Sequence, residues 1–233
     1  MTRARIVFAG DAVLVAEFDD RIDAVVNARA IAVAHAVRSA SVIGVRDVVP
    51  TFRSVAVYFD PLSADVAKIE ALLRDFADTA PPAVTVGSTV VDIPVCYDRE
   101  FAIDVDDVAG FAGLPSPEDV AAIHSARTYR VFMLGFVPGF AYLGTVDERI
   151  AAPRRTSPRR EVPAGSVGIA GLQTGVYPRP TPGGWNIIGR TPMQMLSLDR
   201  AEPSLLRAGD AVRFHPIDRP GFDRIARAQG HRV

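Results

Sequence analysis

Arginines gather in one short segment of this chain, and guanidinium groups suit the recognition of anions. Arg149, Arg154, Arg155, Arg159 and Arg160 lie close together, and no acidic residue interrupts positions 149–160. A guanidinium group can bind a carboxylate or a phosphate through two parallel hydrogen bonds. The segment is therefore either a solvated loop or a binding site for a carboxylate or phosphate.

Two further polar residues are candidates for an anion contact or for catalysis. Arg190 follows Gly189 near the end of an apolar stretch, where a lone arginine points into a cleft or pairs with an acid. His124 lies at the expected end of a helix, and a helix C-terminus favours a protonated imidazole. Such a group serves as an anion ligand or a general acid. A purely structural histidine is equally consistent with the sequence.

The segment 135–192 combines many glycines and prolines with many apolar side chains. Glycine and proline fix unusual backbone angles, and the apolar side chains then hold the turns in place. Residues 137–140 have the pattern of a tight turn, with proline second and glycine third. Residues 181–185 either form a similar turn or use the amides of Gly183 and Gly184 to cradle an anion. We interpret the segment as a shaped binding cleft rather than a self-contained catalytic centre.

Several kinds of chemistry lack the residues that they require. The only lysine is Lys68, in an expected surface helix, so a P-loop, a lysine-dependent serine amidase and a biotin carrier are excluded. No spacing of His, Cys, Asp and Glu resembles a metal site. Gly165 directly precedes Ser166, which does not match a nucleophile elbow.

Charge and cysteine content indicate the cellular setting. The net charge of -1 provides no general attraction to nucleic acid or to an anionic membrane. Cys96 is the only cysteine, so no internal disulfide can form and a reducing compartment is expected. No apolar stretch approaches the roughly 20 residues that span a bilayer. We therefore expect a cytoplasmic protein with neither a nucleic acid nor a membrane as partner.

The first 95 or so residues alternate between strand and helix patterns, which predicts an α+β domain. Strands are expected at 12–18, 45–49, 55–59 and 89–96, and helices at 22–37 and 63–80. Asp19 and Asp20 are the cap candidates of the first helix, and Ser63 is that of the second. Pro81 and Pro82 end the second helix. This β-α-β-β-α-β order is ferredoxin-like. It also occurs in RNA-binding domains, but strand 55–59 lacks their glycine and basic residues.

The remainder, residues 89–233, predicts a mainly-β domain. Two short helices come first, one over 104–111 and one that Ser116 caps and that ends near His124. Apolar segments separated by glycine and proline follow, at 131–134, 166–170, 185–188, 193–198 and 211–214. Short strands of this kind are typical of a barrel or sandwich.

Motifs within the segment 135–192 resemble those of a known family. They are 135–144 (GFVPGFAYLG), 153–155 (PRR) with 158–159 (PR), 162–167 (VPAGSV), 173–177 (QTGVY) and 182–192 (PGGWNIIGRTP). Together they resemble the B subunit of 5-oxoprolinase, also called allophanate hydrolase subunit 1 or the KipI family, of the carboxyltransferase subdomain C–D type. The resemblance covers essentially the whole chain, with one small departure at Thr145, where many members have a second glycine.

The resemblance implies a ferredoxin-like domain over 1–88 followed by a cyclophilin-like barrel over 89–233. It also implies an obligate partner, the KipA-like C subunit or allophanate hydrolase subunit 2, together with a third component, the A subunit. Such a complex cleaves 5-oxoproline to glutamate, with ATP as cosubstrate bound on this chain or on its partner. Two other functions stay open: KipI-like inhibition of a histidine kinase, and the carboxyltransferase part of a urea carboxylase, with biotin carried by another protein.

On the 5-oxoprolinase hypothesis, each candidate residue has an expected role towards a small carboxylate substrate. His124 and Arg190 are the catalytic candidates, as acid/base or anion contacts. The substrate-binding candidates are Arg155, Arg159, Tyr142, Gln173, Tyr177, Gly183, Gly184 and Trp185. Among them the arginines are expected to clamp anions, the aromatic rings to form a wall, and the glycines to donate backbone hydrogen bonds.

Overall fold

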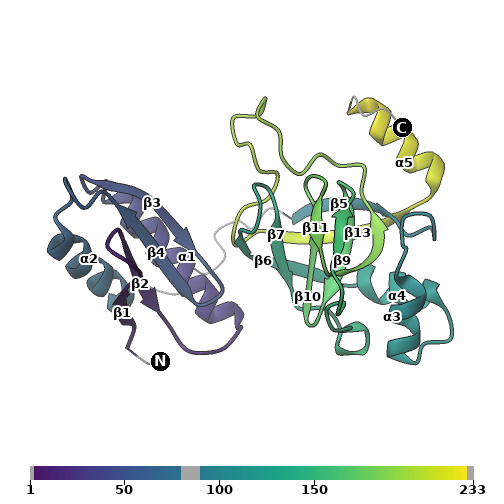
Figure 1. Cartoon of the computed structure of the whole chain (residues 1–233), viewed down its shortest axis with the longest axis horizontal. Helices are drawn as coiled ribbons and strands as arrows, with labels where there is room; N and C mark the ends of the chain where they lie inside the picture. The colour runs from purple at the N-terminus through teal and green to yellow at the C-terminus, as the bar shows by residue number, and fades with distance from the viewer. Residues whose placement is uncertain (1–2, 80–89, 230–233) are drawn as a thin grey trace. The chain divides into compact units, whose positions relative to one another are not determined.

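A computed structural model describes residues 3–79 and 90–229 (Figure 1). The chain divides into two compact units, Met1–Ser88 and Thr89–Val233. Within the described residues, no helix is both long and apolar enough to cross a membrane.

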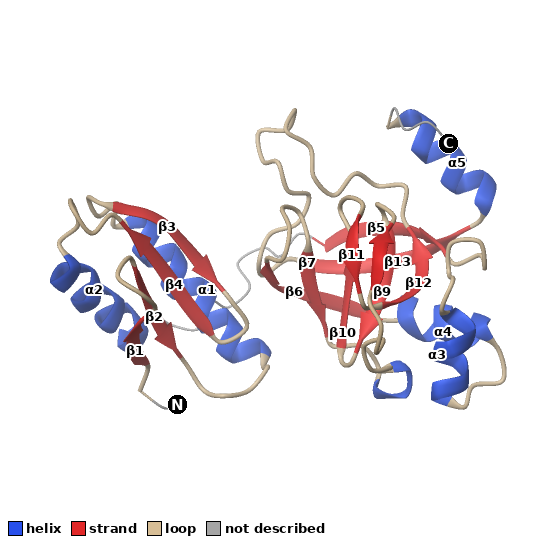
Figure 2. Ribbon diagram, viewed as in Figure 1, coloured by secondary structure: helices blue, strands red, loops and turns tan. Residues whose placement is uncertain are grey.

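The first unit is an antiparallel sheet with two helices. Its strands are β1 (Arg5–Phe8), β2 (Val13–Glu17), β3 (Val45–Pro50) and β4 (Ser54–Phe59), in the order β1-β2-β4-β3. The helices α1 (Ala24–Ser39) and α2 (Val66–Thr79) pack on the same face of this sheet (Figure 2). Between sheet and helices lies a core that includes Leu14, Val33, Val57 and Leu73, each fully buried.

Both helices of the first unit begin at a different residue from the one expected. Asp23, not Asp19 or Asp20, caps α1, because its carboxylate accepts hydrogen bonds from the amides of Val25 and Val26. At α2 the Asp65 carboxylate accepts from the amide of Lys68, at 3.0 Å, in the role expected of Ser63. An aspartate that directly precedes the first turn satisfies amides that a more distant residue cannot reach. The expected stop at Pro81 and Pro82 lies outside the described residues.

The ferredoxin-like arrangement of the first unit is not confirmed. Its expected closing strand is β5 (Val90–Cys96), which pairs in parallel with β13 (Ala211–Ile217) in the second unit. The sheet edge beside β2 is instead occupied by β1, an N-terminal strand that the sequence pattern did not predict. The sequence of β5 predicts a strand but does not show which sheet it joins. That depends on the strand with which it pairs.

The second unit is a closed barrel, which confirms the expected β-barrel. Its strand order is β10-β7-β6-β13-β5-β12-β9. Strands not yet named are β6 (Thr128–Leu134), β7 (Ala141–Gly144), β9 (Ser166–Ala170), β10 (Gln173–Val176) and β12 (Asn186–Arg190). A two-stranded sheet, β8 (Arg159–Val162) and β11 (Thr181–Gly183), lies beside it.

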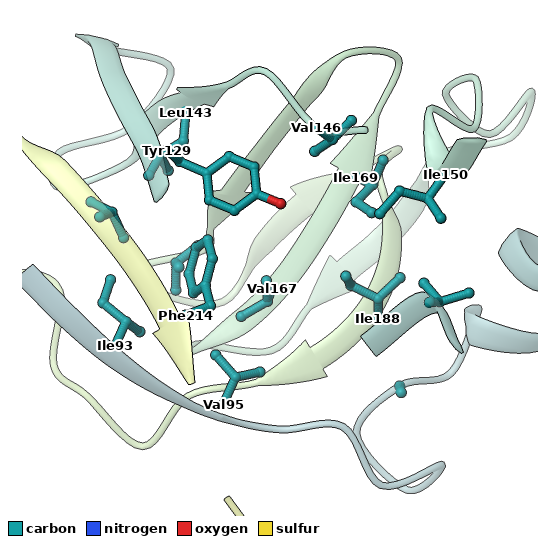
Figure 3. Close-up of a cluster of buried hydrophobic side chains, with 14 of the residues drawn as sticks. Ile93, Val95, Tyr129, Leu143, Val146, Ile150, Val167, Ile169, Ile188 and Phe214 are labelled. Carbon is teal, nitrogen blue, oxygen red and sulfur yellow. The ribbon is translucent and has the colours of Figure 1, made fainter. Parts of the chain in front are cut away.

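Aliphatic side chains and two large rings fill the barrel. In Figure 3 the rings of Tyr129 and Phe214 lie between aliphatic side chains of β5, β9 and β12. Tyr129 is 1% exposed, and its hydroxyl donates a hydrogen bond to the His124 carbonyl oxygen at 2.7 Å. The interior is therefore packed, and any ligand site must lie on the outside of the barrel.

Short helices cover parts of the barrel. α3 (Val105–Ala112), expected over 104–111, ends at Gly113, which has a left-handed conformation. α4 (Pro117–Ser125) starts with a capping box between Ser116 and Asp119, as expected. A fifth helix, α5 (Arg219–Ala228), packs against β5 on another side of the barrel (Figure 1). The expected strand at 193–198 is wrong: the segment has only an isolated bridge between Leu196 and Ser204.

Candidate functional site

A pocket of about 320 Å³ opens beside β7, β10 and β11, and it is called the aromatic pocket below. All of its lining residues lie within the segment 135–192. The predicted binding residues Tyr142, Gln173, Tyr177, Gly183, Gly184 and Trp185 line it together. The structure therefore brings together the predicted aromatic wall, the two glycines and the glutamine.

Phe140 organises the wall of the aromatic pocket. Its ring meets those of Tyr142, Tyr177 and Trp185 edge to face, with centroids 4.9, 5.3 and 5.4 Å apart. Phe136, which also lines the pocket, contacts the edge of Phe140 at 5.6 Å. Edge-to-face pairs of this kind are favourable and restrict the rings to one arrangement. The wall is therefore preformed, which lowers the entropic cost of ligand binding.

The two glycines of the aromatic pocket have different structural roles. A Cβ atom on Gly183 would lie 2.4 Å from the hydroxyl oxygen of Tyr177, so only glycine fits where this strand crosses the buried ring. A Cβ on Gly184 would meet Pro158 at 3.6 Å and the Nη2 atom of Arg154 at 3.8 Å, which are ordinary contacts. Gly184 therefore leaves an open space next to a guanidinium group.

Arg154 supplies the positive charge of the aromatic pocket. Its side chain lines the pocket, and it has no ion pair or hydrogen bond with another described residue. Burial raises the pKa of Tyr142 and Tyr177, and the positive charge of Arg154 acts on both in the opposite direction. Arg154 is thus a positively charged group beside aromatic rings, with its hydrogen-bonding capacity available to a ligand.

Arg155 and Arg159 are not positioned as the predicted anion clamps. Both are paired with Asp104, which is 1% exposed: Arg155 donates to it at 2.8 Å, and Arg159 donates twice, at 2.8 and 2.5 Å. The amide of Ile187 also donates to this carboxylate, at 2.7 Å. These bonds attach the arginine segment to the N-terminus of α3 and to β12. The sequence pattern could not show this pairing, because Asp104 is 51 and 55 residues away from the two arginines.

His124 is a core residue rather than a charged ligand. Its side chain is fully buried, and its ring stacks against those of Tyr129 and Phe214 at centroid distances of 5.2 and 4.7 Å. Burial lowers the pKa of His124 to about 3, so the expectation of a protonated imidazole is wrong. Desolvation outweighs the weak field of a nine-residue helix. His124 does not line the aromatic pocket, and its position gives no support to a catalytic role.

The hydrogen bonds around His124 determine its tautomer. The Thr174 hydroxyl donates to the Gly168 carbonyl oxygen, at 3.0 Å, because that oxygen can only accept. Thr174 therefore accepts from His124 Nε2, at 2.9 Å, and Nε2 carries the proton. Nδ1 is then an acceptor, and the Tyr97 hydroxyl donates to it at 2.8 Å. Every polar atom of the neutral ring is satisfied, which makes this histidine a structural link between α4 and β10.

Arg190 lies in a second cavity, of about 560 Å³, between the end of β12 and α5. This Arg190 cavity is lined by Glu100, Phe101, Arg190, Met193, Arg219 and Phe222, among others, and shares no lining residue with the aromatic pocket. The prediction that Arg190 points into a cleft is confirmed. The structure does not bring Arg190 together with the other predicted site residues.

Sequence reasoning overlooked part of the aromatic pocket. Phe136, Phe140 and Pro158 line it, and Arg154 belongs to it although Arg155 and Arg159 were preferred. The signal for both was present, because Phe136 precedes the turn at residues 137–140 and Phe140 is its last residue. The Phe140 amide donates a hydrogen bond to the Val137 carbonyl oxygen at 3.0 Å. Within residues 3–79 and 90–229, no group of three or more His, Cys, Asp or Glu side chains could hold a metal ion.

Comparison with known proteins identifies the family. The family model described as the carboxyltransferase domain, subdomain C and D, matches residues 4–206. The B subunit of 5-oxoprolinase from Bacillus subtilis (strain 168) is 41% identical over 234 residues, which cover 94% of this chain and 95% of that protein. The protein of the same name from Escherichia coli O157:H7 is 40% identical over 217 residues, covering 93% and 97%.

A solved structure agrees with this match. The crystal structure of TTHA0988 in space group P212121 has 37% sequence identity and a TM-score of 0.80 over 88% of this chain. The present chain spans only 40% of the length of TTHA0988. The chain belongs to the carboxyltransferase-domain family, subdomains C and D, and the two 5-oxoprolinase B subunits are similar to it over almost their whole length.

Proposed function

We propose that this chain is the B subunit of an ATP-dependent 5-oxoprolinase, and that its aromatic pocket binds the 5-oxoproline substrate. The names of its relatives support the assignment to such a complex. The observation that carries the proposal is Arg154, whose positive charge no described acidic residue neutralises, at the edge of a preformed aromatic wall.

The pocket matches the chemistry of a small cyclic amide with one carboxylate. Arg154 can bind the carboxylate through both nitrogens of its fork, and the absence of a side chain at Gly184 leaves room for that group. The flat ring of the substrate would lie against the faces and edges of Tyr142 and Trp185. The side chain of Gln173 offers both a donor and an acceptor for the ring amide.

Other groups of the complex must supply the rest of the reaction. The residues that line the aromatic pocket include no His, Cys, Asp or Glu, and its tyrosines have raised pKa values, which makes them poor bases at neutral pH. The single uncompensated guanidinium does not fit a triphosphate, which carries several negative charges. We therefore assign ATP and the catalytic base to the KipA-like C subunit, with the A subunit as a further component. That TTHA0988 continues well beyond the matched region supports joint action of this module with other domains.

The decisive experiment is reconstitution. The chain is co-expressed with its two partners, the C subunit and the A subunit, and ATP hydrolysis is measured with and without 5-oxoproline. Arg154→Gln is expected to raise the KM for 5-oxoproline at least about tenfold, because it removes a charge-assisted pair of hydrogen bonds. Arg160→Gln is the matched control, since Arg160 is exposed and lines no described pocket, and its KM should stay within about twofold.

Two results would contradict the proposal. An unchanged KM in Arg154→Gln would show that the aromatic pocket does not hold the substrate carboxylate. An assembled complex whose ATP hydrolysis does not respond to 5-oxoproline would remove the assigned reaction.

The description of the family model favours carboxyl transfer as the second candidate function. In that case, ATP hydrolysis would respond to urea in an assay that also contains bicarbonate, a biotin carrier and a biotin carboxylase, which uses the ATP to carboxylate biotin.

A further inference from the structure

The Arg190 cavity is separate from the proposed substrate site. It lies between the C-terminal end of β12 and α5, and its volume is about 560 Å³. Its lining combines apolar side chains, Phe101, Met193, Phe222 and Ala226 among them, with the charged side chains of Glu100, Arg190 and Arg219. The volume lies in the range of cavities that enclose small organic ligands.

A β-bulge directs Arg190 into this cavity. In the pairing of β12 with β9, Ile187 faces Gly168 and Gly189 faces Val167, so Ile188 is an extra residue. Val167 and Ile188 point into the barrel core, whereas Arg190 is paired with Ser166, one position further along. Opposed residues share a face of the sheet, and neighbours along a strand alternate. The bulge therefore places Arg190 on the outer face, a common use of such irregularities.

The guanidinium of Arg190 is held in place but is not neutralised. Its Nε donates to the Ala164 carbonyl oxygen at 2.8 Å, and its Cζ lies 5.6 Å from the ring centroid of Phe101. None of the described acidic residues forms an ion pair with it. Burial, and secondarily the charge of Arg219, lower the pKa of Arg190, whereas the charge of Glu100 acts in the opposite direction. A desolvated positive charge of this kind is stabilised by an anion.

The second arginine of the cavity differs because it has two acidic partners. Arg219 forms ion pairs with Glu100 and, at 2.8 Å, with Asp223. Its Cζ lies 5.0 Å from the ring centroid of Phe101, on which Arg190 also packs. The cavity therefore offers one arginine, Arg190, that forms no ion pair with a described acidic residue and lies beside the apolar side chains of Phe101, Met193 and Phe222.

We propose that the Arg190 cavity is a second ligand site, for a small organic monocarboxylate with an apolar body. The carboxylate pairs with the terminal nitrogens of Arg190, and the apolar body packs between Phe101, Met193 and Phe222. A single available guanidinium favours one negative charge over the several charges of a polyphosphate. This proposal does not depend on whether the aromatic pocket binds 5-oxoproline.

The test is a titration of the full-length chain with 4-fluorobenzoate, followed by fluorine NMR. The uncharged 4-fluorobenzamide is the matched probe. We expect saturable binding of the carboxylate and at least about tenfold weaker binding of the amide. Arg190→Gln should weaken carboxylate binding to a similar extent. Arg160→Gln is the control, because Arg160 is exposed and lines neither cavity, and it should leave the affinity within about twofold.

A second variant, which is expected to strengthen binding of the carboxylate, tests the proposal even if Arg190→Gln does not fold. Glu100→Gln removes an exposed acid near Arg190, and it should strengthen binding of 4-fluorobenzoate roughly two- to fivefold at low salt. The proposal is overturned if both Arg190→Gln and Glu100→Gln leave the affinity unchanged. It is also overturned if only Arg154→Gln loses binding, or if the amide binds as tightly as the carboxylate.

Discussion

The buried histidine gives the barrel a pH dependence that can be calculated. His124 is neutral in the folded protein because burial lowers its pKa to about 3, whereas in the unfolded chain its pKa is near 6.5. Between these two values only the unfolded chain takes up the proton, so the free energy of unfolding falls as the pH falls below about 6.5. Stability is thus fully present above the unfolded pKa and decreases towards low pH.

The size of this effect follows from proton binding to the unfolded chain alone. From pH 7 to pH 5, protonation of one unfolded histidine lowers the free energy of unfolding by about 2 kcal/mol. The calculated loss of stability is the same for any folded pKa of His124 well below 5, so it depends little on how far burial lowers that pKa. The effect is large beside the roughly 5–15 kcal/mol that stabilises a typical domain.

The perturbation is His124→Gln, which removes the titrating group. The Tyr97 and Thr174 hydroxyls lose a well-placed partner, so the variant should be about 1–3 kcal/mol less stable at pH 7. Between pH 7 and pH 5, however, the parent should lose about 2 kcal/mol more than the variant. Titrating groups common to both proteins cancel in this difference.

Urea unfolding followed by tryptophan fluorescence measures this difference. Trp185 is the only tryptophan, and it lies in the barrel unit, so the signal reports on that unit even if the two units unfold separately. The assignment of a neutral, buried His124 would be refuted if the free energy of unfolding changed with pH in the same way, within about 0.5 kcal/mol, in the parent and the variant.

Two further substitutions test the framework of the aromatic pocket, with the same unfolding assay. Asp104→Asn should cost roughly 3 kcal/mol, because two guanidinium groups lose the charge that neutralises them, whereas Asp106→Asn, at an exposed position, should change stability by less than about 0.5 kcal/mol. Equal effects would contradict the central role of Asp104. Gly183→Ala should cost roughly 2 kcal/mol because its Cβ would collide with Tyr177, whereas Gly184→Ala should be nearly neutral. A neutral Gly183→Ala would contradict the close packing at this strand.

Features that depend on neighbours in the sequence were predictable. The capping box of Ser116 and Asp119, the short helix expected over 104–111 and the turn at residues 137–140 arise from contacts within a few positions. The family also followed from the sequence, because its motifs are short continuous runs of residues. The strand pattern limited the second unit to a barrel or sandwich, and the resemblance implied the barrel that the structure shows. The same segment contains all residues that line the aromatic pocket.

The assignment of individual polar residues was decided by tertiary structure alone. Arg154 and Arg155 are adjacent and chemically identical, yet only Arg155 meets Asp104, so only Arg154 keeps its charge for a ligand. His124 meets Thr174, 50 residues away, and burial overrides the helix terminus in setting its charge. β5 is not part of the N-terminal sheet, where it was expected, because it pairs with β13 in the second unit. Charge state and strand partner depend on burial and on distant contacts, which no local pattern contains.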